Sequence, residues 1–196
     1  MIDIWLVRHG QTVENFSRTV QGQLDGKLSL KGIEQAKKVA EVLKGIPFDT
    51  IYSSDLGRAR ETTCYVREYH PQTQVVTSSI LREKFFGILQ GKKIDSLDLD
   101  VSDPWRFIFT IKEGETPEEV GRRAKSFIAG LVVDHQGQKI LAVSHGFFIS
   151  CFINILLGED ICYDNLHKQE NTAINHFSLD EEGRLIRHQL NSTEHL

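Results

Sequence analysis

Two histidines follow apolar stretches that are typical of buried strands, and each is followed by glycine. Arg8 and His9 come after the stretch 2–7, and His145 comes shortly after the stretch 140–143. Ligands of open α/β sheets bind outside the carboxyl ends of the strands, so both imidazoles are expected at one pocket. A neutral imidazole can attack phosphorus and hold the phosphoryl group, which divides one hard displacement into two easier ones. The layout predicts a phosphoryl-transfer site but leaves open which histidine is the nucleophile.

Phosphoryl transfer also needs positive charge and a proton donor. Arg8 and Arg58 are the candidates for holding phosphoryl oxygens, because planar guanidinium groups suit phosphate geometry better than lysine does. Glu83 could protonate the leaving oxygen in a first step and accept a proton from water in a second. The competing interpretation of Glu83 is a solvated charge that pairs with its neighbour Arg82 or Lys84.

The other candidates also have purely structural interpretations. Either histidine alone would more often be a satisfied polar group at a strand end, although two His-Gly strand ends next to an arginine favour function. Arg58 could be an exposed helix charge, and Arg60 is expected to be one because it lies two positions further along and cannot share the same face. Glu115 could do no more than favour a helix start through the helix dipole.

The elements that must position these residues alternate along the chain. The patterns predict strands over 2–7, 48–52, 74–77 and 140–143, and helices over 30–44, 55–69, from 117 onward, and over 147–157. Ser29, Asp55 and Thr116 are the expected helix caps, and Glu119 completes a capping box with Thr116. The C-terminal part alternates as an antiparallel hairpin would over 173–190. The predicted fold is α/β, a three-layer α/β/α sandwich on a mostly parallel mixed sheet.

Composition excludes several classes of protein. The chain has 196 residues and no linker, which predicts a single domain over 1–196, with a lid or insertion over 89–113 where the patterns fade. A net charge of −4 leaves no broad basic face for nucleic acid, and the longest apolar run is too short to span a bilayer. Three cysteines without a CxxC pair and the lack of a visible secretory signal predict a cytoplasmic protein.

No cofactor and no metal site are expected, since the remaining histidines lack HExxH or comparable ligand spacing. These histidines are His70, His135, His167, His176, His188 and His195. The expected partner is a small-molecule phosphate ester, and a homodimer remains open.

Several motifs occur in the order found in a known family. They are Leu6-Val7-Arg8-His9-Gly10-Gln11-Thr12 with Asn15, Gln21-Gly22, the stretch from Tyr52 to Thr62 that contains Arg58, Leu81-Arg82-Glu83, Gly114-Glu115-Thr116, and Val143-Ser144-His145-Gly146. On these motifs the chain resembles the histidine phosphatase superfamily, which has the phosphoglycerate-mutase-like fold, over nearly its whole length.

The resemblance implies a role for each matching residue. His9 would be the phosphorylated nucleophile and Glu83 the proton donor, while Arg8, Arg58 and His145 would hold the phosphoryl oxygens. The residues that match positions lining the same pocket are Asn15, Gln21, Gly22 and Gly146. In the family a backbone carbonyl fixes the other ring nitrogen of the nucleophile, and no metal is implied.

Departures from the mutase pattern favour the phosphatase branch. Mutases of this type are longer and carry an arginine pair with a Pro-rich stretch after the catalytic glutamate, where this chain has only Arg106 and Pro104. Gln21 stands where the mutases place a small hydroxylated residue. Gln90 instead favours the mutase alternative, because the phosphatase branch often has an acidic residue at that position.

The expected function is a metal-independent phosphatase that hydrolyses phosphate monoesters through a phosphohistidine on His9. The alternatives are mutase-type phosphoryl transfer and a non-catalytic phospholigand-binding module. The ester itself stays open among sugar phosphates, phosphoglycerates, a nucleotide-loop phosphate of cobalamin synthesis, and aryl or alkyl esters.

Overall fold

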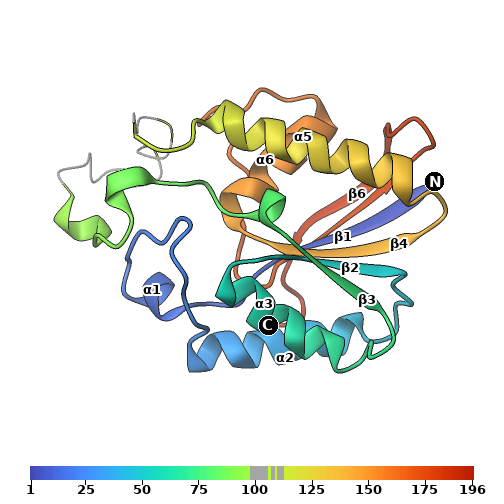
Figure 1. Ribbon diagram of the computed structural model, residues 1–196, viewed down its shortest axis with the longest axis horizontal. Coiled ribbons are helices and arrows are strands. Elements are labelled where there is room, and N and C mark those ends of the chain that lie inside the picture. Colours follow the sequence, from blue (N-terminus) through green and yellow to red (C-terminus); the bar gives the residue numbers. More distant parts are fainter. Residues whose placement is uncertain (98–105, 107–108, 110–112) are drawn as a thin grey trace.

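A mixed sheet of six strands lies at the centre of the described structure (Figure 1). The computed structural model describes residues 1–97, 106, 109 and 113–196. The strand order is β3-β2-β4-β1-β5-β6. The strands are β1 (Ile2–Arg8), β2 (Thr50–Ser54), β3 (Gln74–Ser78), β4 (Lys139–Ser144), β5 (Ile174–Leu179) and β6 (Leu185–Ser192). The helices are α1 (Val13–Phe16), α2 (Leu30–Leu43), α3 (Gly57–Arg67), α5 (Pro117–Asp134) and α6 (Gly146–Leu157), with 3-10 turns at Ser79–Leu81, Gly87–Leu89 and Ile94–Ser96.

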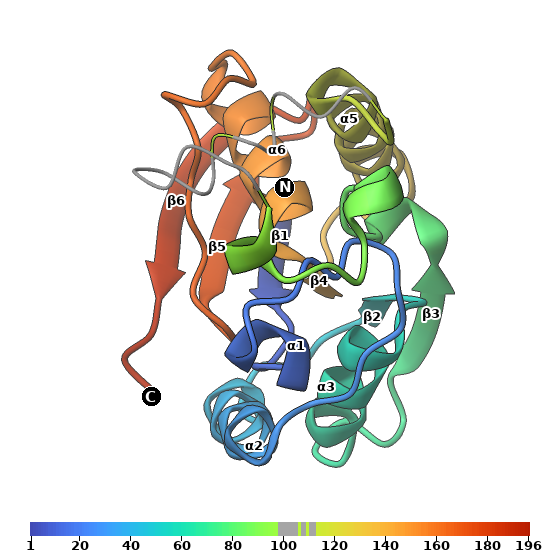
Figure 2. The ribbon, with the colours of Figure 1, turned by 90° about the vertical axis from the view of Figure 1, so that its left-hand side faces the viewer.

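The pairing of the strands is mostly parallel, as predicted. β1 pairs with β4, β4 with β2, and β2 with β3, all in parallel, while β5 lies antiparallel to both β1 and β6. In the register of the central pair, Arg8 lies opposite Ser144. This register brings the two His-Gly sequences to the same edge of the sheet, which Figure 2 views from the side of α1.

Helices cover both faces of the sheet and make the predicted three layers. α5 and α6 lie on one face, and α2 and α3 lie on the other (Figures 1 and 2). β1 contributes side chains to the core on both faces of the sheet, because alternate side chains of a strand point to opposite faces. Ile2, Ile4 and Leu6 pack into the cluster under α5 and α6, whereas Val7 packs into the cluster under α2 and α3.

Two of the three expected helix caps are present. The Ser29 side chain accepts a hydrogen bond from the backbone N–H of Gly32 at the start of α2. Thr116 and Glu119 form the expected capping box at the start of α5. These caps satisfy backbone donors that have no partner within the helix, which explains why both helices begin where the sequence indicates.

The prediction that Asp55 caps the helix α3 is wrong. The residue before α3 is Leu56, which has no side-chain cap, and the backbone N–H of Gly57 donates instead to Asp25 Oδ1 at 2.8 Å. Asp55 accepts from Arg82 Nε at 2.7 Å. β2 also begins later than predicted, at Thr50, because its pairing with β3 and β4 starts there.

The predicted lid or insertion lies largely outside the described residues, and this includes Trp105 and Phe107. Its described part contains a 3-10 turn at Ile94–Ser96. Phe109 packs its ring 5.5 Å from that of Phe147.

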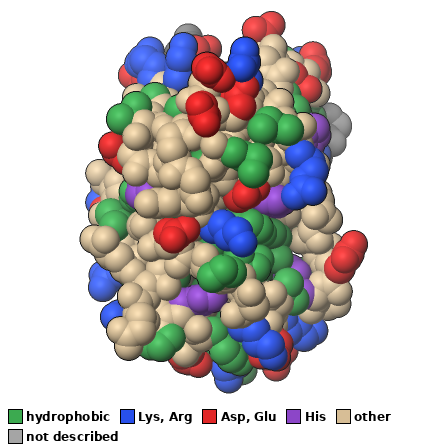
Figure 3. Space-filling model, turned by 90° about the vertical axis from the view of Figure 1, so that its right-hand side faces the viewer, with side chains coloured by type: hydrophobic (Ala, Val, Ile, Leu, Met, Phe, Trp, Pro, Cys, Tyr) green, Lys and Arg blue, Asp and Glu red, His purple; other side chains and the backbone are tan. Residues whose placement is uncertain are grey.

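The surface at the amino ends of the parallel strands mixes acidic, basic and apolar side chains, with no wide basic area on that face (Figure 3). Over the part of the chain that is described, no helix combines the length and the apolar character needed to cross a membrane.

Candidate active site

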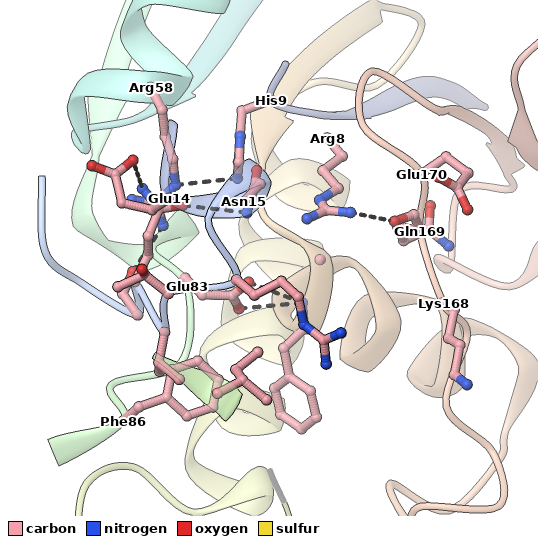
Figure 4. A pocket seen from close by; sticks show the side chains of 18 of the residues that line it. Arg8, His9, Glu14, Asn15, Arg58, Glu83, Phe86, Lys168, Gln169 and Glu170 are labelled. Carbon is pink, nitrogen blue, oxygen red and sulfur yellow. Dashed lines mark hydrogen bonds between the residues drawn. The ribbon is translucent and has the colours of Figure 1, made fainter. Parts of the chain in front are cut away.

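His9 directly follows β1 and is almost completely buried, with 2 % of its surface exposed. Its Nδ1 lies 2.8 Å from the carbonyl oxygen of Gly10. Because a carbonyl oxygen can only accept, Nδ1 carries the proton and Nε2 keeps its lone pair. Nε of Arg58 donates to this Nε2 at 3.1 Å (Figure 4). The contact that the family resemblance implies for the nucleophile is therefore present at His9.

Arg58 lies in the first turn of α3 and is buried, with 1 % exposed, so its interpretation as an exposed helix charge is wrong. Its Nη1 donates to the carbonyl of Leu24 at 2.9 Å and its Nη2 to the carbonyl of Gly22 at 2.8 Å. Burial lowers the pKa of Arg58 to about 10, which still leaves the guanidinium protonated at neutral pH. Arg60 is exposed, as expected.

His145 is fully buried at the start of α6, and its ring centroid lies 5.0 Å from that of His9. Its Nε2 lies 2.8 Å from the hydroxyl oxygen of Ser54. Its Nδ1 and the Nε of Arg8 are buried and have no hydrogen-bond partner among the described residues. Buried polar atoms are almost always paired, so these two atoms are candidates for hydrogen bonds with a bound substrate.

Both imidazoles are held neutral. Burial is the largest cause that keeps the pKa of His9 well below its ordinary value, and the charges of Arg58 and Arg8 lower it further. Burial and the charge of Arg58 likewise keep the pKa of His145 well below its ordinary value. A neutral imidazole is the form that can act as a nucleophile.

Arg8 is the last residue of β1, and its side chain reaches the loop that precedes β5. Its Nη1 donates to the carbonyl oxygen of Gln169 (Figure 4). Burial lowers the pKa of Arg8, whereas the nearby carboxylates of Glu83 and Glu170 raise it.

Glu83 points its carboxylate at the start of α6. Its Oε1 and Oε2 lie 3.2 and 3.3 Å from the backbone N–H of Phe147 (Figure 4), and Oε1 also accepts from the backbone N–H of Lys84. The side chain of Arg82 pairs with Asp55 instead. The interpretation of Glu83 as a solvated partner of its neighbours is therefore wrong.

The four residues expected to line the pocket do so: Asn15, Gln21, Gly22 and Gly146. Gln21 is buried, and its Oε1 accepts from Thr12 Oγ1 at 2.9 Å and from Asn15 Nδ2 at 3.4 Å. Gly22 has φ +55°, which favours glycine, and its carbonyl is one of the acceptors that hold Arg58. These residues shape the loop that carries Asn15 toward the arginine pair.

The cavity has a volume of about 520 Å³ and includes a wall that sequence reasoning missed. Lys168, Gln169 and Glu170 line it from the loop before β5. In the same loop, Nδ2 of Asn171 and the backbone N–H of Thr172 donate to the carbonyl oxygen of His9, at 3.1 and 3.3 Å. The loop shows neither helical nor strand periodicity, and its only signal is a polar run ahead of the C-terminal hairpin.

Part of the cavity lining is apolar. It consists of Val20, Phe86, Ile94, Phe147 and Leu166. Among the described residues there is no cluster of three or more His, Cys, Asp or Glu side chains that could hold a metal ion.

Comparison with known proteins identifies the family. The sequence model of the histidine phosphatase superfamily (branch 1) matches residues 4–192. The chain belongs to the histidine phosphatase superfamily. A relative described as a probable phosphoglycerate mutase, GpmB of Yersinia pestis, is 37 % identical over 165 residues, which cover 81 % of this chain and 76 % of the relative.

Solved structures of this superfamily include similar phosphatases. A phosphoserine phosphatase variant from Entamoeba histolytica, in complex with phosphoserine, has a TM-score of 0.85 and 28 % identity and covers 100 % of both chains. A mycobacterial glucosyl-3-phosphoglycerate phosphatase has a TM-score of 0.84 and 29 % identity and covers 97 % of this chain and 99 % of that one. Because the similar superfamily members include phosphatases and a probable mutase, membership alone leaves the phosphoryl acceptor undecided.

Proposed function

We propose that the protein is a metal-independent phosphomonoesterase that works through a phosphohistidine on His9. One observation carries the proposal. The Nδ1 of His9 is committed to Gly10, and its Nε2 faces Arg58 in a buried cluster where Arg8 and His145 each keep a polar atom that has no partner among the described residues.

In the first step, phosphoryl oxygens bind Arg8, Arg58 and His145. A phosphoryl oxygen takes the Nε–H of Arg58 that His9 holds in the free protein, and this releases the lone pair of His9. Nε2 then bonds to phosphorus while the bond from phosphorus to the ester oxygen breaks, and Glu83 gives its proton to that oxygen.

In the second step, the carboxylate of Glu83 takes a proton from water. The water oxygen bonds to phosphorus, the bond between phosphorus and Nε2 breaks, and inorganic phosphate leaves with His9 neutral again. The arginines offset the charge on the phosphoryl oxygens in both steps.

The apolar side of the cavity supports hydrolysis over mutase chemistry. A mutase must hold a bisphosphate intermediate, so it needs positive charge for the second phosphate group. Besides Arg8 and Arg58, the Lys and Arg side chains among the described residues that line the cavity are Arg18 and Lys168, and Arg18 pairs with Asp95 at 3.2 Å. Arg18 therefore offers less charge to a second phosphate than an unpaired side chain would, and the carboxylate of Glu170 lines the cavity beside Lys168.

The test is a panel of phosphate esters assayed for release of inorganic phosphate. The wild type is expected to hydrolyse members of the panel, and His9→Ala is expected to be inactive. Arg58→Ala should lose about 10²–10³-fold in kcat, as removal of one charge-stabilising donor does. Arg60→Ala, on the exposed side of the same helix, is the matched control and should keep full activity. Equal activity of His9→Ala and wild type would reject the mechanism.

Mutase chemistry is the second candidate, because the GpmB relative favours it. It predicts interconversion of 3- and 2-phosphoglycerate that depends on added bisphosphate, without net release of phosphate. A non-catalytic binding module predicts phosphate binding with no turnover of any ester.

A further inference from the structure

Arg123, on α5, makes five hydrogen bonds, three to the segment that carries Glu83 and two to the carboxylate of Glu115. Nε and Nη2 donate to the two carboxylate oxygens of Glu115, at 2.7 and 2.9 Å. Nη1 donates to the carbonyls of Ile80 and Arg82, at 2.7 and 2.9 Å, and Nη2 also donates to the carbonyl of Glu83 at 3.3 Å. Only a planar guanidinium offers five donors in this fixed arrangement.

Glu115 holds the same segment from its other side, so its role exceeds the helix-dipole effect considered from sequence. Its Oε2 accepts from the backbone N–H of Phe85 at 2.8 Å and from Nε2 of Gln23 at 3.2 Å. Gln23 Nε2 also donates to the carbonyl of Glu83 at 3.1 Å. The buried Lys84 donates its Nζ to the backbone carbonyl of Glu115.

These contacts matter because residues 82–86 belong to no helix or strand. Backbone groups of an irregular segment still need hydrogen-bond partners, and here side chains supply them. Arg123 and Glu115 are 21 % and 20 % exposed at the side chain and do not line the cavity. Burial alone would raise the pKa of Glu115, but hydrogen bonds from Arg123 and Phe85 hold that pKa below its ordinary value, so the Glu115 carboxyl is ionised at neutral pH.

We propose that Glu115 and Arg123 are positioning residues for the proton donor and act on catalysis through the placement of the Glu83 carboxylate. This inference rests on the proposed function, in which Glu83 protonates the leaving oxygen. A proton donor must lie within hydrogen-bond reach of the atom that it protonates. Displacement of the 80–85 backbone would move Glu83 relative to His9, whereas Arg8 and Arg58 donate their hydrogen bonds to other segments.

The experiment compares two esters with leaving groups of different basicity. Phenyl phosphate needs protonation of its leaving oxygen, whereas 2,4-dinitrophenyl phosphate does not, because dinitrophenolate is a stable anion. The quantity to measure is kcat/KM, which covers binding up to departure of the alcohol. Arg123→Lys and Glu115→Gln should each lose about 10- to 100-fold on phenyl phosphate, the cost of misplacing a reacting group by about 1 Å. On 2,4-dinitrophenyl phosphate both variants should stay close to wild type.

Arg122→Lys is the matched control. Arg122 is the next residue on α5, is 71 % exposed at the side chain and pairs with Glu119 at 3.6 Å. This variant should match wild type on both esters. The dinitrophenyl ester also reports folding, because a misfolded variant would lose activity on both esters.

Glu83→Gln separates failure of this inference from failure of the proposed function. Loss on phenyl phosphate alone in Glu83→Gln supports its role as proton donor, and equal loss on both esters rejects that role. If Glu83→Gln discriminates but Arg123→Lys and Glu115→Gln lose both esters equally, or neither, the positioning role is rejected. Adding Arg123→Lys to Glu83→Gln should cause no further loss on phenyl phosphate, whereas additive losses would contradict a shared effect.

Discussion

Nε of Arg58 lies 3.1 Å from Nε2 of His9, so the proposed nucleophile is hydrogen-bonded to a cation in the free protein. The lone pair is thereby occupied until an anion displaces this donor. An ester that binds without offering an oxygen to Arg58 would leave His9 unable to react. In the proposed mechanism, this hydrogen bond couples binding of the phosphoryl group to release of the His9 lone pair.

On the acid side, the loss of kcat/KM should be centred at a pH well below the ordinary histidine pKa of about 6.5. Burial, followed by the charges of Arg58 and Arg8, lowers the pKa of His9, so the imidazole stays neutral as the pH falls through that value. The measurement is kcat/KM against pH, corrected for ionisation of the substrate phosphate. A loss of activity centred near the ordinary histidine pKa after this correction would contradict the prediction.

Stability should fall as the pH drops below about 6.5. The folded-state pKa values of His9 and His145 are both lowered, chiefly by burial, so the unfolded chain binds more protons in the window just below that value. The free energy of unfolding therefore decreases with decreasing pH there. Urea unfolding across this window measures it, and His145→Gln should show a shallower slope than wild type. Identical slopes would show that His145 makes no contribution.

Inorganic phosphate should raise the unfolding temperature of the wild type. Two buried guanidinium groups and unpartnered polar atoms favour an anion that binds the folded chain and not the unfolded one. At a ligand concentration of 100 times Kd, such linkage adds about 2.7 kcal/mol. Chloride at equal ionic strength is the control salt, and Arg58→Ala should lose most of the shift. A similar shift with chloride would indicate a general salt effect.

Gly22→Ala should destabilise the protein and weaken the site. At φ +55° a Cβ would lie 2.1 Å from Oε1 of Gln90, an oxygen that accepts from the backbone N–H groups of Gln23 and Phe86. The left-handed backbone alone costs about 1–2 kcal/mol with a side chain present. Gly137→Ala measures that backbone cost separately, since Gly137 has φ +79° and nothing within 4 Å. Equal losses in the two variants would mean that Gln90 yields without cost.

Much of the site could be predicted because it follows strand ends. A residue directly after a buried strand is placed by the strand itself, so Arg8, His9 and His145 needed only the parallel register to meet. Gln90 shows the limit of motif reasoning. The family resemblance made Gln90 an argument for the mutase branch over the phosphatase branch. In the structure, its Oε1 accepts from the backbone N–H groups of Gln23 and Phe86, and Gln90 is not among the residues that line the cavity.

The contacts that could not be predicted join loops from distant parts of the chain. Asp25 caps α3 across 32 positions, a contact that no local pattern indicates, so the nearer Asp55 was the expected cap. The hydrogen bonds from Arg123 to the backbone on either side of Glu83 likewise depend on how α5 packs against that segment. Periodicity predicts the elements, whereas the irregular segments take their shape from tertiary neighbours.

Asn171 donates to the carbonyl of His9 across 162 positions of the chain. During synthesis, His9 therefore leaves the ribosome long before the loop that completes its surroundings. A polypeptide released before that loop is made would lack this hydrogen bond to His9. Translation must pass residue 171 before the Asn171 side chain can support the backbone of His9.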